Sequence, residues 1–166
     1  RRKLLEAIEV EAAPFVRALC LLPLRPGAMA ALSAGDFEKR TRELTIGKDK
    51  SGRPRRIIVP ETVAALMAEQ AKNKLPAAPL FMRGKGARWS KEYWNQPIAK
   101  AAEKAGLPAG VTAYTLRHSV ITDLVNGGLA LLTVAQISDT SVEMIERHYG
   151  HLNRAAAEQA LAGLAL

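Results

Sequence analysis

The chain has 166 residues, 48% of them hydrophobic, which suits one folded domain and excludes a disordered tail. Lys and Arg number 24 against 16 Asp and Glu, and the resulting net charge of +8 favours a polyanionic partner. No apolar run approaches the roughly 20 residues that span a bilayer. The single cysteine, Cys20, excludes a disulfide framework and indicates a reducing cytosol.

Apolar residues recur at helical spacing over 4–12 and again over 15–22, which predicts two helices at the start of the chain. Pro14 suits the first turn of the second helix, because a proline there costs no backbone hydrogen bond. Pro26 can begin a third helix over 26–33 in the same way. The first part of the chain is therefore expected to be helical.

The pattern changes to β-type residues in RELTIG (42–47) and RRIIVP (55–60), which flank the turn-rich DKSGRP. This predicts an antiparallel hairpin. The region is strongly basic, with Lys39, Arg40, Arg42, Lys48, Lys50, Arg53, Arg55 and Arg56. Two interpretations stay open: a solvated hairpin, or a ribbon whose cations contact phosphates and release counterions.

The rest of the chain again shows helical patterns, joined by a loop-like segment over 75–89 and ended by glycines at 127–128. Helices are predicted over 61–73, 90–104 (bent at Pro97), 115–126, 131–137 and 141–148, with an amphipathic tail over 153–165. The expected fold class is a mainly α domain with a small antiparallel β-sheet (α+β). Trp89, Tyr93 and Trp94 could stack on bases, but the helical spacing of Tyr93 and Trp94 favours the core.

Four segments occur in a telling order: LPLRPG (22–27), KSGRPRR (50–56), YTLRHSVITDLVNGG (114–128) and ERHYGHL (146–152). Together they resemble the catalytic domain of tyrosine recombinases, the phage-integrase family, over about residues 3 to 152. The resemblance implies the fold of these DNA breaking and rejoining enzymes. It also implies site-specific DNA recombination through a covalent 3′-phosphotyrosyl intermediate.

The resemblance assigns roles residue by residue. Arg25 and Arg117 would clamp the non-bridging oxygens of the scissile phosphate, because a guanidinium offers a permanently charged, planar fork. Arg25 follows the apolar run 21–24, precedes a Pro-Gly turn, and is expected to be buried. Tyr149 would be the nucleophile. Lys50 would protonate the leaving 5′ oxygen, with Lys48 as the alternative.

Three positions depart from the family pattern. Tyr114 stands where the family commonly has His, three residues before the second arginine, and its hydroxyl can still donate to a phosphate oxygen. Ala28 follows the first Arg-Pro-Gly, where an acid is frequent. Asp139, ten residues before Tyr149, replaces a hydrogen-bond donor. Its carboxylate would either repel the phosphate or turn away and pair with an arginine.

Further DNA contacts are expected from the hairpin and from histidines near the nucleophile. These candidates are Lys48, Arg53, Arg55, Arg56, His118 and His148. His118 is also expected to pack in the core. The spacing of His148 and His151 is compatible with a metal ion, but no third ligand accompanies them, so a structural or phosphate-contacting role is favoured.

The expected partner is double-stranded DNA, with no metal or nucleotide cofactor because the covalent link conserves the energy of the phosphodiester. The resemblance implies monomers in solution and a homotetramer on DNA, no membrane, accessory DNA-bending proteins as candidate partners, and a cytoplasmic, nucleoid-associated location in a bacterial or phage-derived system. The absence of an initial methionine predicts a fragment, 1–166 being the catalytic domain without its N-terminal DNA-binding domain. The alternatives are a relic that binds DNA without cleaving it and a type IB topoisomerase.

Overall fold

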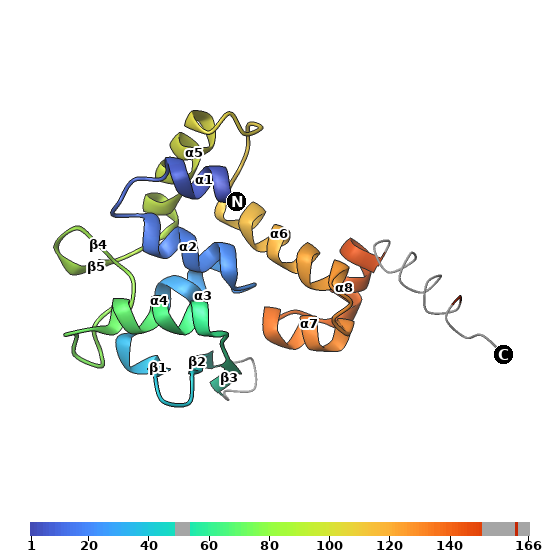
Figure 1. Cartoon of the computed structure of the whole chain (residues 1–166), viewed down its shortest axis with the longest axis horizontal. Helices are drawn as coiled ribbons and strands as arrows, with labels where there is room; N and C mark the ends of the chain where they lie inside the picture. The colour runs from blue at the N-terminus through green and yellow to red at the C-terminus, as the bar shows by residue number, and fades with distance from the viewer. Residues whose placement is uncertain (49–53, 151–161, 163–166) are drawn as a thin grey trace.

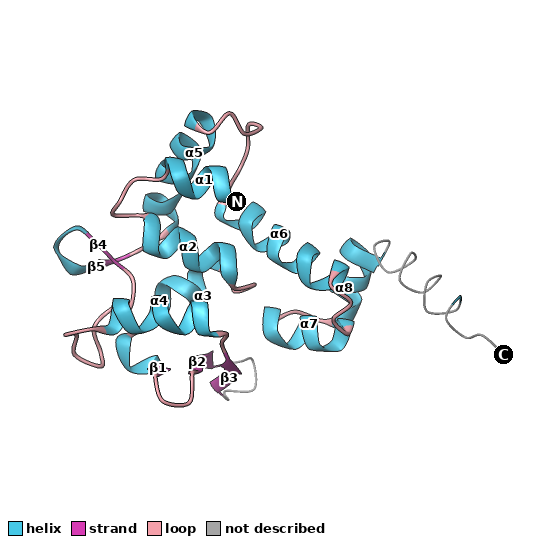
Figure 2. Ribbon diagram, in the orientation of Figure 1, coloured by secondary structure: helices cyan, strands magenta, loops and turns pink. Residues whose placement is uncertain are grey.

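The computed structural model describes residues 1–48, 54–150 and 162. Figures 1 and 2 show a mostly helical molecule in which the strands are short and lie in two separate groups. The helices are α1 (Arg2–Ala7), α2 (Ala13–Leu21), α3 (Pro26–Ala31), α4 (Glu61–Ala71), α5 (Lys91–Lys104), α6 (Ala113–Asn126), α7 (Leu131–Ser138) and α8 (Val142–Tyr149). The strands are β1 (Phe37–Glu38), β2 (Glu43–Lys48), β3 (Pro54–Ile58), β4 (Met82–Arg83) and β5 (Ala87–Arg88). The predicted α+β class is confirmed.

The larger of two hydrophobic clusters is built by α1 to α5 and the start of α6. At its centre the ring of Phe15 stacks on Trp89 and Trp94, with centroid distances of 5.4 and 5.7 Å. Both tryptophans are buried, which confirms the core interpretation for Trp94. Tyr93 is 50% exposed instead, and Arg83 lies over its ring. The core prediction was therefore wrong for Tyr93.

The smaller cluster joins the end of α6 to α7 and α8. Its buried members are Ile121, Val125, Val134, Ala135, Ile145 and Tyr149. Figure 1 shows α6 running from the main body to this pair of helices. One helix therefore contributes to both clusters, and the residues between its two apolar stretches lie at their junction.

The predicted hairpin is present, and a short third strand extends it into a sheet of order β1-β2-β3. Ile46 pairs with Arg55 and Thr45 with Arg56, and the register shifts between Ile46 and Lys48. The turn of the hairpin, with Lys50 and Arg53, lies outside the described residues. On β3, Arg55 is half-buried and Arg56 is exposed, as the alternation of a strand requires.

Several boundaries differ from the prediction. The first helix ends at Ala7 rather than near residue 12, because the backbone becomes extended at Ile8. A two-stranded hairpin, β4–β5, lies in the expected loop 75–89. Two-residue strands such as these and β1 are too short to show an alternating pattern. Among the described residues, no helix is long and apolar enough to cross a membrane.

Candidate active site

Arg25 is held at the surface by the way α3 begins. It is the extended N-cap residue of that helix, and Pro26 follows it in the first turn. Leu24 is fully buried, whereas the side chain of Arg25 is 49% exposed. The expected burial of Arg25 was wrong, because successive side chains of an extended segment point to opposite sides.

Arg117 lies on α6 at the junction of the two hydrophobic clusters and is only 7% exposed. Its Nη1 donates to the carbonyl oxygen of Pro23 at 2.5 Å, and its Nη2 donates to the carbonyl oxygen of Ser138 at 2.7 Å. Pro23 belongs to the main body and Ser138 ends α7. The guanidinium therefore connects the two clusters and gives each carbonyl a charged donor.

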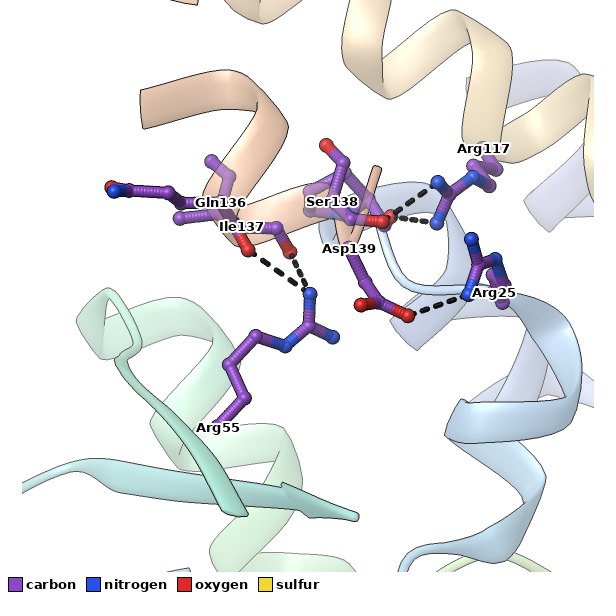
Figure 3. A network of polar contacts seen from close by, with 8 residues as sticks. Arg25, Arg55, Arg117, Gln136, Ile137, Ser138 and Asp139 are labelled. Carbon is purple, nitrogen blue, oxygen red and sulfur yellow. Dashed lines mark hydrogen bonds and ion pairs between the residues drawn. The ribbon is translucent and has the colours of Figure 1, made fainter. Parts of the chain in front are cut away.

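The carboxyl end of α7 is the meeting point of the site (Figure 3). Asp139 ends this helix in the left-handed conformation, with φ of 56°, and its Oδ2 accepts a hydrogen bond from Arg25 Nη1 at 2.6 Å. Arg55 of β3 donates to the carbonyl oxygens of Gln136 and Ile137 at 3.1 and 3.2 Å. Of the two roles considered for Asp139, pairing with an arginine is the one observed.

Three guanidinium groups thus converge on one helix end from α3, α6 and the hairpin (Figure 3). The carboxyl end of a helix carries partial negative charge, which attracts cations. Burial lowers the pKa of Arg117, the nearby charge of Arg25 lowers it further, and burial likewise lowers the pKa of Arg55. A cleft of about 240 Å³ with Arg55 and Asp139 in its lining opens beside them. To bind an anion, these guanidinium groups would have to exchange contacts with the end of α7 for contacts with the anion.

Tyr149 is the last residue of α8 and is 7% exposed. Its hydroxyl is hydrogen-bonded to Nδ1 of His118, which follows Arg117 on α6. Burial raises the pKa of Tyr149, and the charge of Arg117 opposes this rise. Tyr149 and Arg117 are thus close enough to interact electrostatically.

His118 was expected in the core, but its side chain is exposed. It lies beside Arg117 on the helix surface, where α8 approaches α6. The part of the ring that contacts Tyr149 is covered, and this partial burial lowers the pKa of His118; the charges of Arg117 and His148 lower it further. His148 is also exposed, and its ring meets the ring of Tyr149 edge-on at a centroid distance of 6.4 Å.

The comparison with known proteins places this geometry in a family. The family model described as "Phage integrase family" matches residues 3–156. The chain belongs to the phage integrase family. Tyrosine recombinase XerC of Rhizobium meliloti (strain 1021) is 31% identical over 120 residues, which are 69% of this chain and 37% of the relative. Tyrosine recombinase XerD of Mycobacterium tuberculosis (strain ATCC 25618 / H37Rv) is 38% identical over 60 residues, or 36% of this chain and 19% of the relative.

Solved structures share the fold. The Tn1549 transposon integrase in complex with transposon right end DNA gives a TM-score of 0.82 at 19% identity, covering 99% of this chain and 64% of that one. The XerA recombinase gives a TM-score of 0.76 at 21% identity, covering 98% of this chain and 60% of that one. The segments that match this chain make up well under half the length of these XerC and XerD relatives.

The other predicted site residues of this phage integrase family member are placed as follows. Tyr114 lies one turn before Arg117 on α6 and is 52% exposed. Lys48 ends β2, with Pro54 as its Cα partner. Arg56 is exposed and pairs with Glu43 at 3.5 Å. The hydrogen bond between His118 and Tyr149 was missed, since no sequence pattern connects two residues 31 positions apart.

The capping of α8 gives a first prediction. The Ser141 side chain accepts a hydrogen bond from the backbone N–H of Met144 at 3.2 Å, which stabilises the helix that carries Tyr149. We expect Ser141→Ala to destabilise α8 by about 1 kcal/mol, because a typical N-cap contributes that much. Hydrogen exchange of the α8 amides would show faster opening. Ser141→Asp keeps an acceptor at this position and should retain wild-type protection; equal exchange in both variants would contradict the role of the cap.

Proposed function

We propose that this chain is the catalytic domain of a site-specific DNA recombinase that cleaves and rejoins strands through Tyr149. One observation carries the proposal. Segments far apart in the sequence bring the guanidinium groups of Arg25, Arg55 and Arg117 to one helix end, with the Tyr149 hydroxyl within electrostatic range of Arg117. Double-stranded DNA is the proposed substrate, bound by a homotetramer that assembles from monomers. Accessory DNA-bending proteins are candidate partners.

The chemistry follows from the residue types. Tyr149 Oη attacks the phosphorus of the scissile phosphate, the bond from phosphorus to O5′ breaks, and a 3′-phosphotyrosyl bond forms. Negative charge develops on the non-bridging oxygens, where Arg25 and Arg117 stabilise it. The leaving 5′ oxygen takes a proton from a hairpin lysine, Lys50 or Lys48. The 5′ hydroxyl of another strand reverses the step, so no nucleotide hydrolysis is needed.

The remaining contacts are proposed by position. Lys48 ends β2, and Arg55 and Arg56 lie on β3, so the hairpin can track the DNA backbone with the turn residue Arg53. Two further side chains near the site are proposed to contact phosphates: Tyr114 and His148. With the cations of the hairpin they would surround the scissile position.

One observation favours an alternative, a protein that binds DNA without cleaving it. The Asp139 carboxylate pairs with Arg25 at 2.6 Å, so it occupies a donor that is proposed to bind a phosphate oxygen. A bound phosphate must therefore displace this carboxylate or meet its charge. A type IB topoisomerase is the third candidate, since it shares the phosphotyrosyl chemistry.

A suicide-substrate assay separates these functions. Nicked duplexes from pools of sequence flanking the native gene are mixed with the full-length protein and resolved on denaturing gels. We expect a covalent adduct with the wild-type protein and none with Tyr149→Phe, because only the phenol oxygen is removed.

The outcomes are distinct. DNA that shifts on native gels without forming an adduct would favour the binding-only alternative. An adduct accompanied by relaxation of supercoils without a paired site would favour the topoisomerase. An adduct that persists in Tyr149→Phe would show that another residue is the nucleophile.

A further inference from the structure

The nucleophile candidate already has a hydrogen-bond partner that can accept its proton. Among the contacts of the described residues, the Tyr149 hydroxyl is bonded to Nδ1 of His118. Their rings lie at a centroid distance of 6.0 Å and an interplanar angle of 34°. Because α6 and α8 are joined through the smaller hydrophobic cluster, both partners rest on packed helices. The contact is thus built into the fold.

We propose that His118 is the general base that takes the phenolic proton of Tyr149 when the nucleophile attacks. The inference rests on the proposed function and adds to it the residue that activates the nucleophile. His118 is the residue after the proposed clamp arginine, so the same helix turn would hold the phosphate and receive the proton. In this role His118 acts on Tyr149 and not on a DNA phosphate, as was expected from the sequence.

The electrostatic surroundings of the two side chains favour this direction of proton transfer. The pKa of Tyr149 is raised by burial, so the phenol keeps its proton at neutral pH and needs a base. The pKa of His118 is lowered from 6.5 by burial and then by Arg117 and His148, so its imidazole is neutral at the same pH. The charge of Arg25 lowers the pKa of Arg117, the charged neighbour of His118, and the charge of Asp139 raises it. A neutral imidazole can accept at Nδ1 only as the tautomer with hydrogen on Nε2.

Proton transfers accompany both cleavage and rejoining. As the Tyr149 Oη to phosphorus bond forms, the proton moves from Oη to His118 Nδ1 and gives an imidazolium. The bond to O5′ breaks, and the hairpin lysine supplies the proton of the departing hydroxyl. In rejoining, the incoming 5′ hydroxyl returns its proton to the hairpin lysine as its oxygen bonds to phosphorus, and the imidazolium returns its proton to Oη as the bond from Oη to phosphorus breaks.

The decisive variants are His118→Asn and His118→Ala. Asparagine keeps a hydrogen-bond acceptor near Nδ1 but has no basic nitrogen, so it can position the phenol without taking the proton. We expect both variants to form adduct about 10² to 10³ times more slowly than wild type, within the range for general bases, with unchanged DNA affinity. Added imidazole should partly restore the His118→Ala rate. A wild-type rate in His118→Asn would overturn the proposal and leave positioning as the role.

The pH dependence of adduct formation distinguishes a general base at His118 from a residue that only positions Tyr149. With wild-type protein, the rate of adduct formation should rise as His118 loses its proton below pH 6.5 and then level off. That limb should be absent in His118→Asn. If the limb persists unchanged in the variant, His118 is not the base, while the adduct at Tyr149 still supports the recombinase.

A second measurement needs no activity. In ¹⁵N-histidine NMR spectra, assigned by the loss of the signal in His118→Asn, Nδ1 should be the unprotonated nitrogen of the neutral ring. Tyr149→Phe should raise the pKa of His118, because the hydroxyl that stabilises the neutral ring is gone. A neutral ring protonated at Nδ1 would donate to Tyr149 and would overturn the proposal, whatever the adduct assay shows.

Discussion

Replacing Arg117 with Met is expected to weaken the fold and abolish strand cleavage together. Arg117 is 7% exposed, and its guanidinium donates to the carbonyl oxygens of Pro23, which precedes α3 in the main body, and Ser138, which ends α7. Methionine fills a similar volume but leaves both acceptors without this donor, at a cost of about 1–3 kcal/mol for each buried group. Loss of one charged donor to the transition state costs a further factor of roughly 10² to 10³ in cleavage rate.

Urea unfolding and the adduct assay measure these two effects separately. Arg117→Lys keeps the charge but cannot reproduce the planar fork, so it should recover part of the stability and little of the cleavage. Arg56→Met is the control for stability, because Arg56 is an exposed strand residue with a 3.5 Å ion pair, and such pairs contribute about 0–1 kcal/mol. Unfolding of Arg117→Met at the wild-type urea concentration would show that the guanidinium does not hold the clusters together.

Asp139→Asn should increase adduct formation by about tenfold or more. At effective ε of about 20, two unit charges about 4 Å apart interact by about 4 kcal/mol, so a carboxylate near the phosphate site is a large opposing charge. Asparagine removes the charge at nearly constant shape and tolerates the left-handed backbone, where φ is 56°. Stability should change by about 1 kcal/mol or less, because the pair with Arg25 is partly exposed.

Asp139→Glu is the matched control, since it keeps the charge and should stay at or below the wild-type rate. Asp139→His adds a donor and should exceed Asp139→Asn if the phosphate approaches this position. Adduct formation by each variant on the same nicked duplex, with DNA affinity measured in parallel, tests the series. A decrease in Asp139→Asn would mean that the carboxylate orients Arg25 for catalysis and does not compete with the phosphate.

Local patterns were enough to predict most elements of this fold. Helical spacing and the glycines at 127–128 located the helices of the last third, and turn residues between β-type runs located the β2–β3 hairpin. The two-residue strands β1, β4 and β5 were not predicted, because such short strands form only where tertiary contacts align them. The first helix ended early for a related reason. Ile8 and Ala12 are at helical spacing, but they follow the end of α1 and pack on the core from a turn.

The site was predictable only as a set of residue types in order. The segments around Arg25, Arg117 and Tyr149 stand out because each resembles a family motif, and the match over residues 3–156 supports that resemblance. Burial was misjudged at Arg25 and His118, where the side-chain direction depends on how a helix begins or which neighbour covers it.

The sequence by itself determined the family, the fold class and the list of chemically capable side chains, because these depend on motifs and on the periodicity of apolar residues. Only the tertiary structure decided which of them meet. The pairing of Arg25 with Asp139, the two carbonyls that bind Arg117, and the contact between His118 and Tyr149 all join residues far apart in the chain. Such polar contacts depend on distance and direction in three dimensions, which spacing along a chain does not encode.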